Sequence, residues 1–205
     1  MKRGLFIVLD GIDGSGKSTQ IGLLSQFLFL GFKKSHVFLT REPFISPHYQ
    51  QIRDLLKSGV DPKENGEKFL ELFVADRRFH AEVITKQLEQ GFHVICDRYK
   101  YSTLVYQSAQ GLPIEKVLAA HEGLLVPDLT VILDLSAKEA LGRIQVDDER
   151  THAEFFEKEE FLKELREGYK NLPKLLPTEN IVILDATRDP RITAEDIKKL
   201  TKKLL

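Results

Sequence analysis

Several residue types that mark large protein classes are scarce in this sequence. It contains no tryptophan and only one cysteine, Cys96, which lies in an apolar run. One cysteine cannot form an intrachain disulfide, so we expect a reduced, cytoplasmic environment. No apolar stretch approaches the ~20 residues that a membrane-spanning helix needs. The apolar run at residues 5–9 lacks the length and the cleavage site of a signal peptide, so we expect no export.

An excess of charge of one sign is also missing. Lys and Arg number 30 against 31 Asp and Glu, which gives a formal net charge of -1. A balanced surface does not attract nucleic acid or anionic lipid without specific contacts, so we expect no nucleic-acid partner and no membrane partner. Residues 147–160 depart from this balance because acidic residues predominate there, which predicts an exposed, mobile segment.

What the sequence does contain is a regular alternation of two patterns. Short apolar runs, typical of strands buried on both faces of a parallel sheet, occur at residues 5–9, 37–39, 92–96, 129–133 and 181–184. Segments of helical period separate them, and Gly31 and Gly91 are placed to end two of these helices. The pattern predicts one α/β domain over residues 1–205, a three-layer sandwich with ligands at the carboxyl ends of its strands.

A phosphate-binding loop follows the first predicted strand. Residues 11–18 match G-x-x-x-x-G-K-[ST], the P-loop, whose glycines let backbone N–H groups surround phosphate oxygens at a helix N-terminus. Lys17 would reach the β- and γ-phosphates, and the Ser18 hydroxyl would ligate Mg²⁺. The predicted ATP-binding residues are Gly11, Ile12, Asp13, Gly14, Ser15, Gly16, Lys17, Ser18 and Thr19. The alternative is a glycine turn that only tightens a strand-helix corner.

A P-loop alone does not define the reaction, because GTPases, motor ATPases and kinases share it. The sequence has no N-K-x-D motif for reading guanine and no D-x-x-G downstream of the loop. A small-molecule kinase is therefore the favoured class. A nucleotide-dependent switch or regulatory ATPase, which hydrolyses ATP only with a partner bound, is the alternative from another class.

A second polar pair follows the third predicted strand. Asp97 lies where a carboxylate beside the P-loop can hold Mg²⁺, directly or through water. Arg98 can bind the phosphate of an acceptor through its forked guanidinium. By itself, an Asp-Arg pair at a strand end is equally typical of a structural ion pair.

Seven blocks in order and spacing resemble the thymidylate kinase family over nearly the whole chain. They are residues 10–20, 40–43, 72–77, 97–107, 127–128, 156–161 and 184–186. The resemblance implies a five-stranded parallel sheet in a P-loop kinase fold and a homodimer. It also implies an activity, the Mg²⁺-dependent transfer of the γ-phosphate of ATP to dTMP.

Carried over by position, the resemblance implies a role for each of eight substrate-binding residues. Phe73 would stack on thymine, Arg77 would donate to its carbonyl edge, and Asp13 would bind the 3′-hydroxyl. Arg53 and Arg98 would hold the acceptor phosphate. The last three are Thr103 and Gln107, which would complete the base pocket, and Tyr106, which would pack where a 2′-hydroxyl would sit. Without the resemblance, core packing is the favoured interpretation of both Phe73 and Tyr106.

The charge over the transferred phosphate is expected from a lid at about residues 143–160. Some family members place an arginine where this chain has Gly14, and others supply basic residues from the lid. We therefore predict that Arg143 and Arg150 act in catalysis. The alternative for these arginines is a surface pairing with Glu139 and Asp147. Other nucleotide kinases fit less well, since the adenylate kinase loop differs and deoxynucleoside kinases usually carry a base-site tryptophan.

Overall fold

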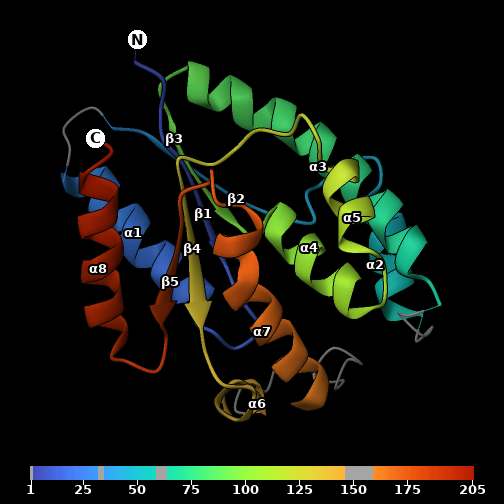
Figure 1. Ribbon diagram of the computed structural model, residues 1–205. Helices are drawn as coiled ribbons and strands as arrows, with labels where there is room; N and C mark the ends of the chain where they lie inside the picture. Colours follow the sequence, from blue (N-terminus) through green and yellow to red (C-terminus); the bar gives the residue numbers. More distant parts are fainter. Residues whose placement is uncertain (1, 32–34, 59–63, 146–158) are drawn as a thin grey trace.

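The computed structural model describes residues 2–31, 35–58, 64–145 and 159–205. Its centre is a five-stranded, all-parallel sheet with strand order β2-β3-β1-β4-β5, drawn as arrows in Figure 1. The strands are β1 (Phe6–Asp10), β2 (Val37–Arg41), β3 (His93–Asp97), β4 (Leu129–Asp134) and β5 (Ile181–Asp185). β1 is central and buried along its whole length, as its continuous apolar sequence predicts.

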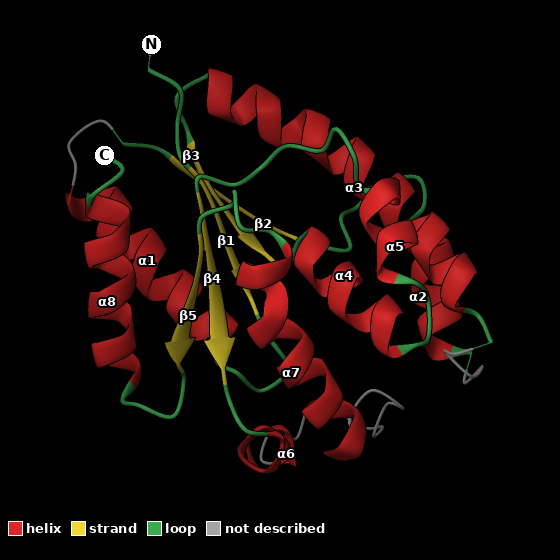
Figure 2. Ribbon diagram, viewed as in Figure 1, coloured by secondary structure: helices red, strands yellow, loops and turns green. Residues whose placement is uncertain are grey.

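Helices cover both faces of this sheet, so the three-layer α/β prediction is confirmed (Figure 2). The helices described are α1 (Lys17–Gly31), α2 (Tyr49–Lys57), α3 (Gly66–Glu89), α4 (Lys100–Ala109), α5 (Ile114–Ala120), α6 (Ala137–Gln145), α7 (Glu159–Leu175) and α8 (Pro190–Lys202). α1 packs against α8 on one face, while α3, α4 and α7 form the opposite layer. No helix of the described residues is long and apolar enough to cross a membrane.

All five strand predictions are confirmed, with ends shifted by one or two residues. The helices expected before Gly31 and Gly91, after Ala137, around Phe161 and towards the C-terminus are also present. Three helices, α2, α4 and α5, were not predicted. α4 is buried on most sides, so it lacks the one-sided apolar stripe by which a helix is usually recognised.

Part of the acidic segment has a different structure from the one predicted. Residues 146–158 lie outside the described part of the chain, but Glu159 and Glu160 begin α7. Two carboxylates in a first helical turn are favourable because they face the positive end of the helix dipole. The acidic composition of residues 147–160 thus includes a helix start as well as a connecting segment.

The sheet places the carboxyl ends of β1, β3 and β4 side by side. Leu9 in β1 is aligned with Asp97 in β3, and Asp10 with Ile132 in β4. The P-loop leaves the sheet at the end of β1, and the segment after β3 leaves beside it. The two predicted polar segments therefore meet at one edge of the sheet, as the parallel arrangement requires.

Candidate active site

The P-loop has backbone conformations that only glycine adopts easily. Gly11, Gly14 and Gly16 have φ values of 137°, 77° and 90°. A Cβ atom built on Gly14 would lie 2.8 Å from the carbonyl oxygen of Ala140, at the start of α6. An arginine at this position would therefore require α6 to move, which explains in physical terms why this chain has glycine there.

Lys17, the first residue of α1, is directed back over the loop. Its Nζ donates to the carbonyl oxygens of Gly11 at 3.1 Å and Ile12 at 3.0 Å. Burial of the ammonium and the nearby positive charge of Arg98 lower the pKa of Lys17 to about 8, although Asp13 opposes the shift. The ammonium is consequently a destabilised cation, which an incoming phosphate would stabilise.

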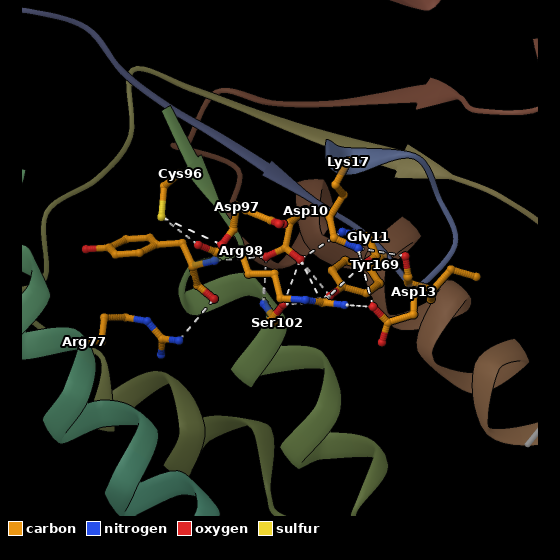
Figure 3. Close-up of polar contacts among 12 residues, drawn as sticks. Asp10, Gly11, Asp13, Lys17, Arg77, Cys96, Asp97, Arg98, Ser102 and Tyr169 are labelled. Atoms are coloured by element: carbon orange, nitrogen blue, oxygen red, sulfur yellow. Dashed lines mark hydrogen bonds and ion pairs between the residues drawn. The ribbon is translucent and has the colours of Figure 1, made fainter. Parts of the chain in front are cut away.

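Asp10 links the P-loop to helices α4 and α7, although it was not predicted as a site residue. Its side chain is fully buried, and its Oδ1 accepts hydrogen bonds from the Gly11 N–H, the Ser102 hydroxyl and the Tyr169 hydroxyl (Figure 3). These bonds join β1 to α4 and α7 at 2.7–2.9 Å. A carboxylate at the end of an otherwise apolar strand was the available signal for this residue.

Arg98 crosses from β3 to the P-loop. Its φ of 67° is the one positive value among the described non-glycine residues. Its Nη2 donates to Asp13 Oδ1 at 2.8 Å, and its Nη1 donates to Ser102 Oγ at 2.8 Å (Figure 3). Burial is the largest single influence and acts against its charge, but Asp13, Tyr106, Tyr169 and Asp10 together outweigh it, so the pKa of Arg98 lies well above its usual value. Arg98 is therefore a permanent cation between the P-loop and α4.

The two predicted Mg²⁺ ligands differ in their surroundings. Ser18 lies exposed at the start of α1, while Oδ1 of Asp97 is buried without a hydrogen-bond partner in the described part of the chain. A buried carboxylate oxygen in this state is a suitable ligand for a hard cation. No group of three or more metal-binding side chains is found within the described ranges.

A cavity of about 230 Å³ lies beside the P-loop. Its lining includes all eight predicted substrate-binding residues: Asp13, Arg53, Phe73, Arg77, Arg98, Thr103, Tyr106 and Gln107. These residues come from the P-loop, α2, α3, the β3-α4 connection and α4. The structure thus brings the predicted set together, while the role of each member stays a prediction. Glu42 and Gln110 also line the cavity and were not predicted.

Aromatic side chains form two walls of this cavity. Phe73 is only partly buried, and its ring is stacked with Phe69 at 6.0 Å between centroids and 16° between planes. Tyr106 lies 5.6 Å from the guanidinium of Arg98 and meets Phe161 of α7 edge-on. Because Phe73 lines the cavity and keeps an accessible surface, it differs from the fully buried core phenylalanine that was the alternative.

Arg77 is almost completely buried and strongly bonded. Its Nε donates to Glu42 Oε2 at 2.6 Å, its Nη1 to Thr103 Oγ1 at 3.0 Å, and its Nη2 to the Tyr99 carbonyl at 3.3 Å. An arginine buried on an apolar helix face needs an anion or a ligand. The structure supplies the anion, Glu42, from the end of β2.

Of the two predicted lid arginines, Arg143 lies within the described residues. Arg143 Nη2 donates to the Ala186 carbonyl at 3.0 Å, and its Nη1 lies 3.4 Å from the Gly14 carbonyl. These contacts place Arg143 against the P-loop, whereas Glu139 accepts from Ser136. Arg150 and Asp147 lie outside the described residues, and the catalytic roles of Arg143 and Arg150 stay predictions.

The fold and the site together define a P-loop phosphotransferase that acts on a nucleotide. The P-loop supplies the ATP site, and a cavity with an aromatic wall and three arginines lies directly beside it. The sequence model of the thymidylate kinase family matches residues 9–197. The chain belongs to the thymidylate kinase family.

The alignments with individual relatives also cover most of both chains. A probable thymidylate kinase of Methanococcus maripaludis is 38% identical over 190 residues, which is 90% of this chain and 88% of the relative. A probable thymidylate kinase of Pyrococcus horikoshii is 40% identical over 184 residues, or 88% of each chain. A thymidylate kinase of Symbiobacterium thermophilum is 38% identical over 209 residues, covering 98% of this chain and 94% of the relative.

Proposed function

We propose that this protein transfers the γ-phosphoryl group of ATP to dTMP, giving dTDP and ADP. The observation that carries the proposal is the position of the cavity. Its aromatic wall at Phe73 and its arginine at Arg77 suit a pyrimidine with a carbonyl edge, and Arg98 bonded to Asp13 joins the cavity to the P-loop. An acceptor monophosphate in this cavity would therefore face the ATP phosphates.

The reaction requires little proton transfer. A phosphate monoester has a second pKa near 6, so the acceptor is already an anionic nucleophile at neutral pH. The main barrier is the approach of two anions in line and the spread of charge over the transferred group. Lys17 would bind the donor phosphates, Arg98 and Arg53 the acceptor phosphate, and a lid arginine the γ-phosphate. Asp13 would orient the sugar.

Mg²⁺ would be held by Ser18 and Asp97 together with the ATP phosphates. The buried, unpartnered Oδ1 of Asp97 supports this assignment. Bound there, the ion would supply positive charge that offsets the negative charge of the phosphates. Replacing Asp97 with Asn should raise the Mg²⁺ concentration needed for half-maximal activity more than it raises KM for dTMP.

The direct test is the rate with a panel of acceptors, dTMP, dUMP, UMP, dCMP and dGMP, each with Mg-ATP. We expect dTMP and dUMP to be preferred, because Arg77 donates to a 4-carbonyl and opposes the amino group of cytosine. One methyl group is worth only ~1–3 kcal/mol, so discrimination between dTMP and dUMP should be the weaker step. Arg77→Ala should reduce the preference for dTMP over dCMP. A wild type that prefers dCMP or dGMP contradicts the proposal.

The same panel separates the kinase from the regulatory ATPase. Rapid ADP formation should require added dTMP, since a closed site excludes water as an acceptor. The sugar contact has its own control. Tyr106→Ala should narrow the preference for dUMP over UMP, because the ring fills the space of a 2′-hydroxyl. ADP formation without an acceptor would favour the ATPase.

We also propose that residues 1–205 act as one domain, with a lid at about 143–160, and that two copies form a homodimer. Support for a dimer comes from apolar side chains exposed near β2 and α3: Leu39 at 49%, Ile45 at 81% and Phe79 at 41%. Exposed apolar side chains of this size mark interaction surfaces when they gather. Light scattering at micromolar concentration should give twice 23.5 kDa, and Phe79→Glu should lower that mass.

A further inference from the structure

The hydrogen bonds of Arg77 leave it little freedom. A guanidinium has five N–H groups. Within the described residues, Glu42 takes the Nε–H, Thr103 and His121 take Nη1, and the Tyr99 carbonyl takes one N–H of Nη2. Arg77 also lines the acceptor cavity. The second N–H of Nη2 is then the group that can donate a hydrogen bond to a ligand in this cavity.

His121, the C-cap residue of α5, holds the far side of this guanidinium. Its Nε2 lies 2.7 Å from Arg77 Nη1, and its Nδ1 lies 2.6 Å from the Val117 carbonyl. Since a carbonyl can only accept, Nδ1 carries the proton and Nε2 presents a lone pair to Arg77. Burial, and next the charge of Arg77, lower the pKa of His121 to about 3, so this neutral tautomer persists at physiological pH.

We propose that His121 is a positioning residue for acceptor recognition, because its neutral imidazole holds the Arg77 guanidinium in the plane that presents one N–H to the pyrimidine carbonyl. The proposal deepens the proposed function and rests on it. His121 itself is not a catalytic residue, since it does not line the acceptor cavity.

Three partners besides His121 hold the guanidinium: Glu42 at Nε, Thr103 at Nη1 and the Tyr99 carbonyl at Nη2. Glu42 at 2.6 Å supplies the charge partner. His121 at 2.7 Å is the closer of the two partners of Nη1, since Thr103 lies at 3.0 Å, so it is the stronger constraint on that nitrogen. A histidine is suited to the position because it accepts a hydrogen bond without adding a second negative charge, which would draw Arg77 away from the ligand.

A second cavity lies next to His121, so removal of the imidazole would open space beside Arg77. His121 also lines a second cavity of about 390 Å³, whose lining includes Leu104 and Leu118 as well as the carboxylates Glu122 and Glu179. Without the imidazole, Nη1 of Arg77 would face this space, where Glu122 lies exposed and Glu179 is already paired with Lys100 at 2.6 Å. The expected defect is consequently misdirection of Arg77 rather than loss of the fold.

The test compares His121→Leu, which removes the acceptor, with His121→Gln, whose side-chain oxygen can replace Nε2. For His121→Leu we expect KM for dTMP to rise ~10- to 100-fold, the scale of a hydrogen bond to a charged group. The preference for dTMP over dCMP should fall, while KM for ATP stays within ~2-fold. His121→Gln should recover most of both losses. A purely structural role would not produce this rescue or this difference between substrates.

A double variant tests whether His121 acts through Arg77. Arg77→Ala with His121→Leu should be no worse for KM of dTMP than Arg77→Ala alone, because the two residues form one unit. Should His121→Leu not fold, His121→Met provides a second apolar variant of flexible shape.

Three outcomes would overturn the positioning role: an unchanged KM and preference in the apolar variants, an equal rise of KM for ATP and dTMP, or additive losses in the double variant. A wild type that does not phosphorylate dTMP would overturn the proposed function as well. If the wild type phosphorylates dTMP and an apolar His121 variant has the same KM and the same preference, the positioning role alone would be overturned.

Discussion

The two halves of the site bind their ligands by different physical means. On the phosphate side, Lys17 bonds to two backbone carbonyls, and its nearest carboxylate, Asp13, is 3.9 Å away. On the base side, Arg77 has a carboxylate at 2.6 Å and is held by further hydrogen bonds. Lys17 thus keeps its charge for an incoming anion, while the charge of Arg77 is already balanced. The phosphate side thus offers positive charge, whereas the base side offers a hydrogen-bond donor held in a fixed orientation.

This difference matches what each half must distinguish. Phosphate groups are alike in every nucleotide, so a flexible cation and backbone N–H groups are sufficient for them. Pyrimidines differ by a carbonyl or an amino group at one position, so recognition depends on the orientation of single hydrogen bonds. Variants on the phosphate side should therefore lower the rate with all acceptors, and those on the base side should change the order of acceptors.

The largest expected effect concerns the lid arginines. An arginine that stabilises the transferred phosphate is worth ~10³–10⁵ in turnover, so Arg143→Ala or Arg150→Ala should lower kcat on that scale for every acceptor. The contacts of Arg143 with Gly14 and Ala186 make it the first variant to measure. Near-normal kcat in both single variants would instead indicate surface pairs worth less than ~1 kcal/mol.

Lys17→Ala should have the next largest effect. Loss of a cation that stabilises the transition state costs ~10²–10⁴ in turnover. The fold should remain intact, because the hydrogen bonds of the Lys17 ammonium are with its own loop. Lys170→Ala, in an exposed pair with Glu167, is the matched control and should keep wild-type turnover. A Lys17→Ala variant with more than half of the wild-type kcat would contradict its role in the P-loop.

On the base side, Glu42→Ala should lower stability as well as recognition. Removing one partner of a buried ion pair typically costs ~3–5 kcal/mol, because the other charge stays buried. Here the partner is Arg77, and both side chains are at most 3% exposed. Denaturant unfolding measures the change, with Asp196→Ala, from the exposed pair with Arg188, as a control expected to lose little stability. Equal losses in both variants would show that the buried pair has no special role.

The pH dependence should give the smallest effect and should be confined to the phosphate side. Since the pKa of Lys17 is lowered to about 8, kcat/KM for ATP should fall above pH 8 by up to ~10-fold per unit. Bound phosphate favours the protonated amine, so kcat alone should fall at a higher pH. Between pH 8 and 10.5 the unfolded chain binds more protons at this lysine than the folded chain, so its contribution to the free energy of unfolding rises. Lys17→Met should lack both changes, whereas their persistence would assign them to another group.

Most of the fold could be predicted because its signals are local. Each strand is a continuous apolar run, and the P-loop is a contiguous motif whose glycines have the positive φ values that the motif requires. The exceptions also have local causes. α4 is buried on most sides and shows no single apolar face, and Glu159 and Glu160 read as a connecting segment until they are placed at a helix start.

The sequence by itself determined the sheet, the P-loop and, through the order of its motifs, the family. Only the tertiary structure decided which polar residues support the site: Asp10, Glu42, His121 and Tyr169. Their partners are far away in sequence; Asp10 and Tyr169 are 159 positions apart, and Arg77 and His121 are 44. A buried polar group needs a partner, but its own neighbours in the chain do not show which one it has. That choice depends on which strand ends and helices the fold brings together.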